Sequence, residues 1–220
     1  MKQRTQDLLF AACGVASVVV MFAGLGIGAA GGREFATISS SSAQITKALA
    51  SPAGAAVWTG AYLELLSFGF FIAFAMWVTA KLGGGVLGSV ARAAATSYAT
   101  LSVASLCLMD AIEYRAGHGI GLQLGTTLIT LNEALFVGTW FLAVFFLLAV
   151  GPLALGSGRR ALGWSAIAVA AITLVTTATS LDNLGQMSNV LWLAWIIAAS
   201  IALGRGGRRR ESVVAIPQQA

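Results

Sequence analysis

The sequence predicts an all-α integral membrane protein, a bundle of six transmembrane helices. Its 220 residues are 58% hydrophobic and only 10% charged, whereas soluble domains are about 25% charged. The apolar residues run on without interruption, in stretches near the roughly 20 residues that a helix needs to cross the hydrocarbon of a bilayer. A barrel strand would be about 10 residues long with alternating polarity, so helices are expected rather than strands.

Six spans follow one another along the chain. Four uncharged stretches are long enough alone, and two more qualify once each accommodates a carboxylate. The fourth span is extended back toward Gly125 and so includes Glu133. The expected spans are residues 8–30, 55–80, 91–110, 125–150, 161–181 and 188–204. They form one transmembrane domain over residues 1–204, followed by a basic tail at residues 205–220.

The first span resembles a signal peptide only at its basic start. Its apolar run from Leu8 to Gly32 is much longer than the about 7–15 apolar residues of a secretory signal. We therefore expect it to remain as a membrane anchor.

Basic residues give the orientation. Ten of them fall on the side that holds both termini: Lys2, Arg4, Lys81, Arg92, Arg159, Arg160, Arg205, Arg208, Arg209 and Arg210. The other side holds only Arg33, Lys47 and Arg115. Because positive loops face the cytoplasm, both termini are expected to be cytoplasmic. The scattered basic residues have a sufficient explanation in topology, so no nucleic-acid partner is expected.

The loop before the second span carries a short helix of its own. Serines at positions 39–42, the amphipathic run 43–49 and Pro52 predict a two-turn helix at the membrane surface. It either lies across the mouth of the bundle or closes an outward cavity. At the inner side, residues 81–85 predict a flexible turn, and Gly151-Pro152 is expected to end the fourth span.

Small residues predict the helix contacts. Gly24 and Gly28 form a G-x-x-x-G pair on the first span, and Ala166 and Ala170 form a similar pair on the fifth. Such pairs let two backbones approach closely inside a membrane. Trp140, Trp192 and Trp195 lie deep in their spans and are expected to be packing residues.

Placing a carboxylate inside a membrane span costs free energy, so such residues mark candidate functional sites. Glu64, Asp110 and Glu133 belong to the second, third and fourth spans. Counted from the inner boundary, all three lie roughly 24–27 Å up the helices, in the outer part of the membrane. Short loops make these spans neighbours, so the carboxylates are expected to converge.

Polar residues share helix faces with these carboxylates. Thr130 accompanies Glu133, and Tyr98 accompanies Glu113. The candidate binding residues are Glu64, Tyr98, Asp110, Glu113, Thr130 and Glu133. They predict an outward-facing pocket for a cation, a proton or an amine-bearing molecule. The alternative is that the carboxylates are interfacial residues, or are protonated or hydrogen-bonded within the packing.

The sequence contains few residues that could support catalysis or bind a cofactor. Two Cys and one His are too few for a dedicated zinc or haem site, so no metal and no cofactor is expected. No serine-hydrolase or metalloprotease motif occurs, and we do not expect an enzyme. An enzyme acting on a lipid with Asp110, Glu113 and His118 would still need a nucleophile or a metal.

Three features give a family resemblance. A short helix at residues 42–49 precedes a span opening with Ala61-Tyr62-Leu63, and a later loop reads Arg159-Arg160-Ala161-Leu162-Gly163-Trp164. This order resembles a large group of bacterial multi-pass membrane proteins classed by a domain of unknown function. The resemblance implies the six-helix architecture and no activity. Glu64 departs from that pattern, in which apolar residues are commoner at this place.

Two functions are therefore carried forward. The first is a small transporter or permease-like protein of the cell (inner) membrane, using the outward carboxylate pocket. The alternative is a structural or accessory subunit that partners another membrane protein, or a second copy of itself, through its Gly- and Ala-rich faces. In both cases the lipid bilayer is the first partner.

Overall fold

The computed structural model describes residues 3–33, 36–37, 39–50, 52–116, 118–178 and 182–205. Seven helices occur in this part of the chain: α1 (Gln3–Ala30), α2 (Ser42–Ala50), α3 (Ala55–Leu82), α4 (Gly85–Arg115), α5 (Leu122–Gly156), α6 (Arg160–Ala178) and α7 (Asp182–Arg205). All except α2 are long and apolar enough to cross a membrane. The predicted all-α bundle of six spans is confirmed. The basic tail lies outside the described residues beyond Arg205.

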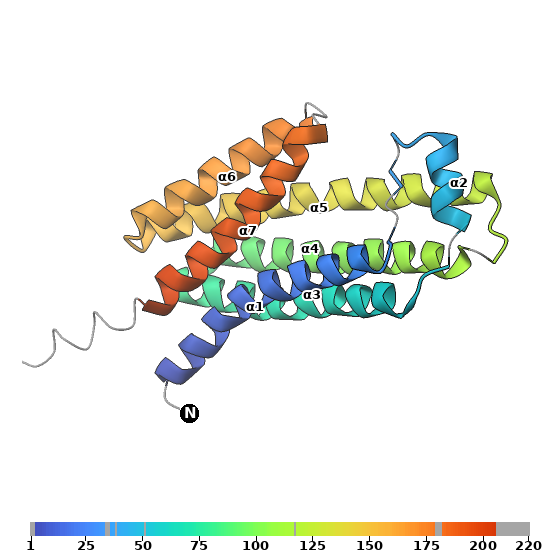
Figure 1. The fold of residues 1–220 in the computed structure, drawn as a ribbon. Coiled ribbons are helices and arrows are strands. Elements are labelled where there is room, and N and C mark those ends of the chain that lie inside the picture. Colours follow the sequence, from blue (N-terminus) through green and yellow to red (C-terminus); the bar gives the residue numbers. More distant parts are fainter. Residues whose placement is uncertain are drawn as a thin grey trace, which may run out of the picture.

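The six long helices form a closed ring. Each contacts the next in the order α1, α3, α4, α5, α6, α7, and α7 returns to α1. In Figure 1 the helices α1, α3, α4 and α5 run alongside one another, and α6 and α7 form an inclined hairpin. The short α2 lies across one end of the ring. We call this end the Arg33 end, and the end with the α3–α4 turn the Lys81 end.

Aromatic rings fill the middle of the ring. Phe71 and Phe146 each meet Trp192 edge-on, with ring centroids 5.7 Å apart, and Trp192 stacks on Trp195 at 6.1 Å. Trp140 is also buried. The prediction that the three deep tryptophans are packing residues is therefore confirmed. Large apolar side chains on the outside of the ring face the region where lipid would lie.

The α1–α3 contact depends on glycine. A Cβ on Gly60 of α3 would lie 2.6 Å from the carbonyl oxygen of Gly24 and 2.8 Å from the amide nitrogen of Gly28. Only glycine permits this backbone approach, as the G-x-x-x-G pair predicts. On α6, Ala166 and Ala170 are both fully buried. These small-residue faces are therefore occupied within the chain.

Two connections differ from the expected boundaries. The fourth span was expected to end at Gly151-Pro152, but α5 continues through Pro152 to Gly156, so that expectation is wrong. A proline removes one backbone donor, whereas ending the helix inside the membrane would leave the groups of a whole turn unpaired. Helix α4 also extends beyond the expected 91–110, to Gly85 and Arg115.

The short surface helix is confirmed as α2. It begins with a capping box: the backbone N–H of Ser41 donates to Gln44 Oε1 at 2.7 Å, and the Gln44 N–H donates to Ser41 Oγ at 3.3 Å. Ile45 and Leu49 are buried on its inner face, in a small cluster with Ile112 of α4 and Ile129 of α5. This cluster holds α2 over the Arg33 end.

An ion pair closes the opposite end. Lys81 of α3 donates to Asp7 of α1 at 2.6 Å, and Trp77 Nε1 donates to the same carboxylate at 3.0 Å. Helices α1 and α3 are therefore joined at both ends, which fixes the register of the glycine contact between them.

Candidate functional site

The site begins with the turn that ends α1. Gly32 has φ +82°, the left-handed conformation that glycine adopts without steric penalty. The Gly32 N–H donates to the Ala29 carbonyl at 3.0 Å, and the Arg33 N–H donates to the Gly28 carbonyl at 3.1 Å. These two bonds are a Schellman motif. The turn reverses the chain, so that Arg33 lies back along α1 with its Cδ over Gly28.

Arg33 lies among three carboxylates from two other helices. Its Nη1 contacts Glu64 of α3 at 2.6 Å, and its Nε contacts Glu113 of α4 at 2.5 Å. Its Nη2 lies 3.5 Å from Asp110 of α4. The Arg33 side chain is 1% exposed. We call these four residues the Arg33 cluster.

The cluster is electrostatically unbalanced. Burial works against the charged form of Arg33, but the hydrogen bond that Arg33 donates to Glu113 and the charges of Glu113, Glu64 and Asp110 outweigh it and raise the pKa of Arg33. The guanidinium is therefore a permanent cation. It faces three carboxylates, and two buried oxygens of the cluster, Asp110 Oδ1 and Glu113 Oε2, have no hydrogen-bond partner.

A cavity of about 270 Å³ lies beside this cluster, inside the ring of helices. It is bordered by five helices, α1, α3, α4, α5 and α7. Its lining residues are Met21, Phe22, Leu25, Glu64, Phe68, Tyr98, Ser102, Ser105, Leu106, Phe136, Thr139, Trp140, Ala143, Asn189, Val190, Trp192 and Leu193. Among these residues Glu64 is the only charged one, so the cavity touches the Arg33 cluster through Glu64 alone.

Aromatic side chains dominate the walls, with a few polar groups between them. The Trp192 Nε1–H donates to the Tyr98 hydroxyl at 3.3 Å, which joins α7 to α4. Ser105 of α4 donates to Asn132 Oδ1 of α5 at 2.8 Å. These bonds hold the polar groups of the walls in fixed positions.

The rim of the cavity reaches the lipid-facing surface. Phe22 is 53% exposed, Phe136 46% and Val190 60%, and all three also line the cavity. They come from α1, α5 and α7. The cavity therefore opens sideways between these helices, where a molecule dissolved in the bilayer would reach it.

A second and much smaller cavity lies at the Arg33 end. Its volume is about 40 Å³, and its lining includes Gly32, Arg33, Pro52, Val57 and Glu113. Such a space is large enough for a water molecule with polar partners. Arg33 and Glu113 are its two charged lining residues, and Glu113 does not line the large cavity.

The predicted site residues separate into two groups. Glu64, Asp110 and Glu113 meet at Arg33, and Tyr98 lines the large cavity. Glu133 is half-buried on α5 and is not among the carboxylates that pair with Arg33. Thr130 is exposed and donates to the Thr126 carbonyl on the same helix. The expected convergence therefore includes Glu113 in place of Glu133.

Arg33 is the functional residue that sequence reasoning missed. It was counted only as one of three basic residues on the outer side. One signal in the sequence could have indicated its role. Arg33 directly follows the glycines that end the first span, at the level of three carboxylates that have no other expected partner. Nothing in the sequence spacing says that the side chain turns inward.

Asp110, Glu113 and His118, the residues considered for an enzyme acting on lipid, do not come together at one point in the structure. His118 is exposed, stacks on Tyr114 at 5.9 Å and contacts the Ala116 carbonyl at 3.1 Å. Asp110 and Glu113 pair with Arg33 instead. In the described part of the chain no group of three His, Cys, Asp or Glu residues is placed to hold a metal ion.

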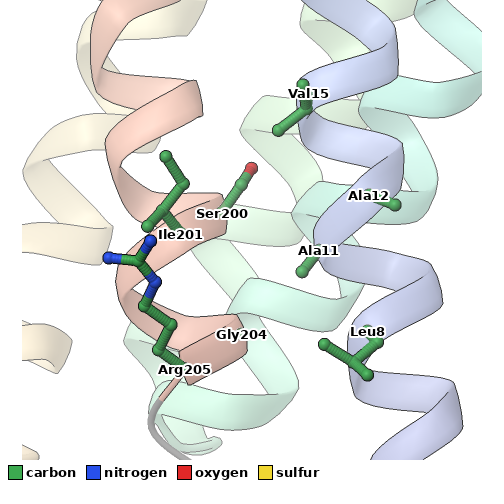
Figure 2. Close-up of a pocket in the computed structure, with 8 residues that line it drawn as sticks. All are labelled: Leu8, Ala11, Ala12, Val15, Ser200, Ile201, Gly204 and Arg205. Atoms are coloured by element: carbon green, nitrogen blue, oxygen red, sulfur yellow. The ribbon is translucent and has the colours of Figure 1, made fainter.

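A further groove lies between α1 and α7 near the Lys81 end, with a volume of about 370 Å³. Figure 2 shows Ser200 pointing from α7 into this groove, with Ala11 and Leu8 on the facing side of α1. Arg205 is its one charged lining residue. The groove has no carboxylate and lies away from the Arg33 cluster, so it is not part of the candidate site.

Comparison of the chain with protein-family models, with curated proteins and with solved structures finds no match. Membership of the bacterial group named above therefore stays a prediction. The chemistry of the site follows from its geometry: an apolar, aromatic cavity that opens to lipid, with an acidic ion cluster against one wall. Such a site is suited to bind a molecule that is mostly apolar and carries positive charge.

Proposed function

We propose that this protein is a small permease-like membrane protein that binds an amphiphilic organic cation in the large cavity. In this proposal the Arg33 end faces outward and both termini face the cytoplasm of a bacterial cell, as the basic residues predict. The observation that carries the proposal is the lining of the cavity: aromatic rings, one carboxylate and no basic side chain.

Two forces favour a cation there. Aromatic faces attract positive charge, most strongly for tryptophan, and Trp140 and Trp192 both line the cavity. The Arg33 cluster holds three carboxylates against one guanidinium, so its field at the cavity is negative when all are ionised. Both forces act at short range in a site without bulk water.

The size of the cavity limits the ligand to a small molecule. About 270 Å³ is at the lower end of the roughly 300–1,000 Å³ typical of small-molecule pockets. The sideways opening gives access from the bilayer, which suits a ligand with an apolar body. A fully hydrated inorganic ion would find few polar partners on these walls.

Charge dependence is the sharpest test of this proposal. Benzyltrimethylammonium and neopentylbenzene have nearly the same shape and differ in whether a quaternary nitrogen or a carbon stands at the branch point. We expect the cation, and not its neutral counterpart, to raise the melting temperature of the protein in lipid nanodiscs, because a ligand of the folded state stabilises it. Equal responses to the two probes would overturn the proposed preference.

A pair of variants on α5 places the binding event in the cavity. Ala143 is buried and lines the cavity, whereas Ala134 is exposed on the same helix. Ala143→Leu should fill the cavity and remove the response to the cation, while Ala134→Leu should keep it. In proteoliposomes, Ala134→Leu should take up benzyltrimethylammonium as the wild type does, whereas Ala143→Leu should show only the background leak. Uptake by Ala143→Leu at the wild-type rate would refute the permease function.

A further inference from the structure

The Arg33 cluster contains more negative charge than Arg33 can neutralise. Three carboxylates face one guanidinium. Among the described residues at the Arg33 end, the other charged side chains on the packed elements are Lys47 of α2, exposed, Glu133 of α5, half-buried, and Arg115 at the exposed end of α4. A buried carboxylate without a counter-charge takes up a proton rather than remain ionised.

Two oxygen atoms of the cluster are available to carry such a proton. Asp110 Oδ1 and Glu113 Oε2 are buried and have no hydrogen-bond partner, and Glu113 as a residue is only 9% exposed. Both residues lie on α4, three positions apart, so they are neighbours on one helix face. Glu113 uses its other oxygen, Oε1, for a short contact to Arg33, and Glu64 Oε1 makes a second such contact.

We propose that Asp110 and Glu113 form a proton-binding pair that holds one proton while the large cavity is empty. The proton is released when an organic cation binds next to Glu64. This inference rests on the proposed function, because the cation is the ligand of the large cavity. The pair holds the proton jointly, since two coupled carboxylates titrate as a unit.

Glu64 connects the two sites. It lines the large cavity and also contacts Arg33 Nη1 at 2.6 Å. A cation at Glu64 supplies the positive charge that the proton otherwise provides, so the two compete for the same negative field. The O–H bond of the carboxylic acid breaks, the carboxylate keeps the electron pair, and the proton passes to water in the small cavity that Glu113 lines.

A proton suits the pair better than a metal ion does. The Arg33 guanidinium occupies the point at which the three carboxylates converge, where a metal ion would have to bind all of them. Within the described ranges no three metal-ligating side chains are grouped around one point. A proton needs an oxygen that accepts no hydrogen bond. Glu113 Oε2 is such an atom, and Asp110 Oδ1 has only the 3.5 Å contact with Arg33 Nη2.

Proton release is measured directly as benzyltrimethylammonium is added to the protein in nanodiscs, in weak buffer with a pH-indicating dye. We expect about one proton per bound cation, and an affinity that rises by up to about tenfold per pH unit while the pair is protonated. Binding without release, or with an affinity independent of pH, would overturn the inference and leave the proposed function standing. No binding at all would overturn the proposed function instead.

Replacing single carboxylates by neutral amides shows which residues bind the proton. Glu113→Gln and Asp110→Asn imitate the protonated side chains, so both should keep binding and lose proton release. Glu133→Gln is the matched control, a half-buried carboxylate of α5 outside the Arg33 cluster, and should release the proton as the wild type does. Loss of release in Glu133→Gln alone would place the proton elsewhere and refute the assignment.

A measurement without ligand tests the pair independently. Infrared spectra of the wild type at neutral pH should show the C=O stretch of a protonated carboxyl group, shifted in deuterated buffer. The band should weaken in Glu113→Gln and Asp110→Asn and persist in Glu133→Gln. If the wild type has no such band, the pair is ionised when the cavity is empty and the inference fails, whatever the ligand does.

Discussion

Removal of the Arg33 guanidinium should destabilise the fold strongly. Arg33→Met keeps most of the aliphatic stem over Gly28 and leaves Glu64, Asp110 and Glu113 without their shared cation. Arg33 makes two short charged hydrogen bonds, at 2.5 and 2.6 Å, each of about 1.5–3 kcal/mol. Loss of one partner from a buried ion pair typically costs about 3–5 kcal/mol. We therefore expect the free energy of unfolding to fall by about 3–5 kcal/mol.

The assay is reversible unfolding in mixed micelles, followed by tryptophan fluorescence at several pH values. The loss should shrink as the pH falls, because protons can then neutralise the carboxylates that Arg33 no longer pairs. The double variant Arg33→Met with Glu113→Gln should regain part of the stability, since it removes charge from both sides. If Arg33→Met unfolds with the free energy of the wild type at every pH, the buried cluster does not hold the helices together and the reasoning is refuted.

Three further predictions concern the backbone, and each is checked by the same unfolding assay. Gly60→Ala should cost about 1–3 kcal/mol, because its Cβ would lie 2.6 Å from a carbonyl oxygen of α1. Gly69→Ala, with nothing within 4 Å, is the control on the same helix and should be neutral or stabilising. Gly32→Ala should cost about 1–2 kcal/mol through its left-handed backbone and should loosen Arg33, which proton release would reveal. Pro152→Ala should stabilise α5, because alanine restores the missing donor; destabilisation would mean that the proline itself packs.

The architecture could be predicted because the bilayer imposes it. Uninterrupted apolar runs of sufficient length must be helices when every backbone group has to be satisfied within the segment. Boundaries were less certain, because a helix can extend past the hydrocarbon. Helix α4 adds a turn or more at each end, and the turn at its carboxyl end carries Glu113. Pro152 was misjudged because rules from soluble helices overstate its effect inside a membrane.

The sequence predicts how deep in the membrane the carboxylates lie, but not which side chains contact one another. Periodicity and length put Glu64 and Asp110 at one level, and the ion pairs confirm that level. Which side chains meet depends on rotation of each helix about its axis, and an apolar surface all round gives no preferred rotation. The sequence predicts Glu133 in the cluster on this incomplete basis, whereas the ion pairs of Arg33 described above are with Glu64, Asp110 and Glu113. The role of Arg33 required a turn geometry that spacing alone does not encode.

That turn geometry also explains why the acidic side chains can remain inside the membrane domain. Carboxylates on two neighbouring spans, α3 and α4, would repel one another and push the helices apart. Arg33 comes from a third segment, where the positive φ of Gly32 and the absence of a side chain at Gly28 let it turn toward them, and it attracts them to one point. Because a single cation holds Glu64 of α3 and Glu113 of α4 together, any ligand or proton that changes the charge of either residue changes the force between α1, α3 and α4. We therefore expect a binding event at Glu64 to change the ion pairs at the Arg33 end through the shared guanidinium.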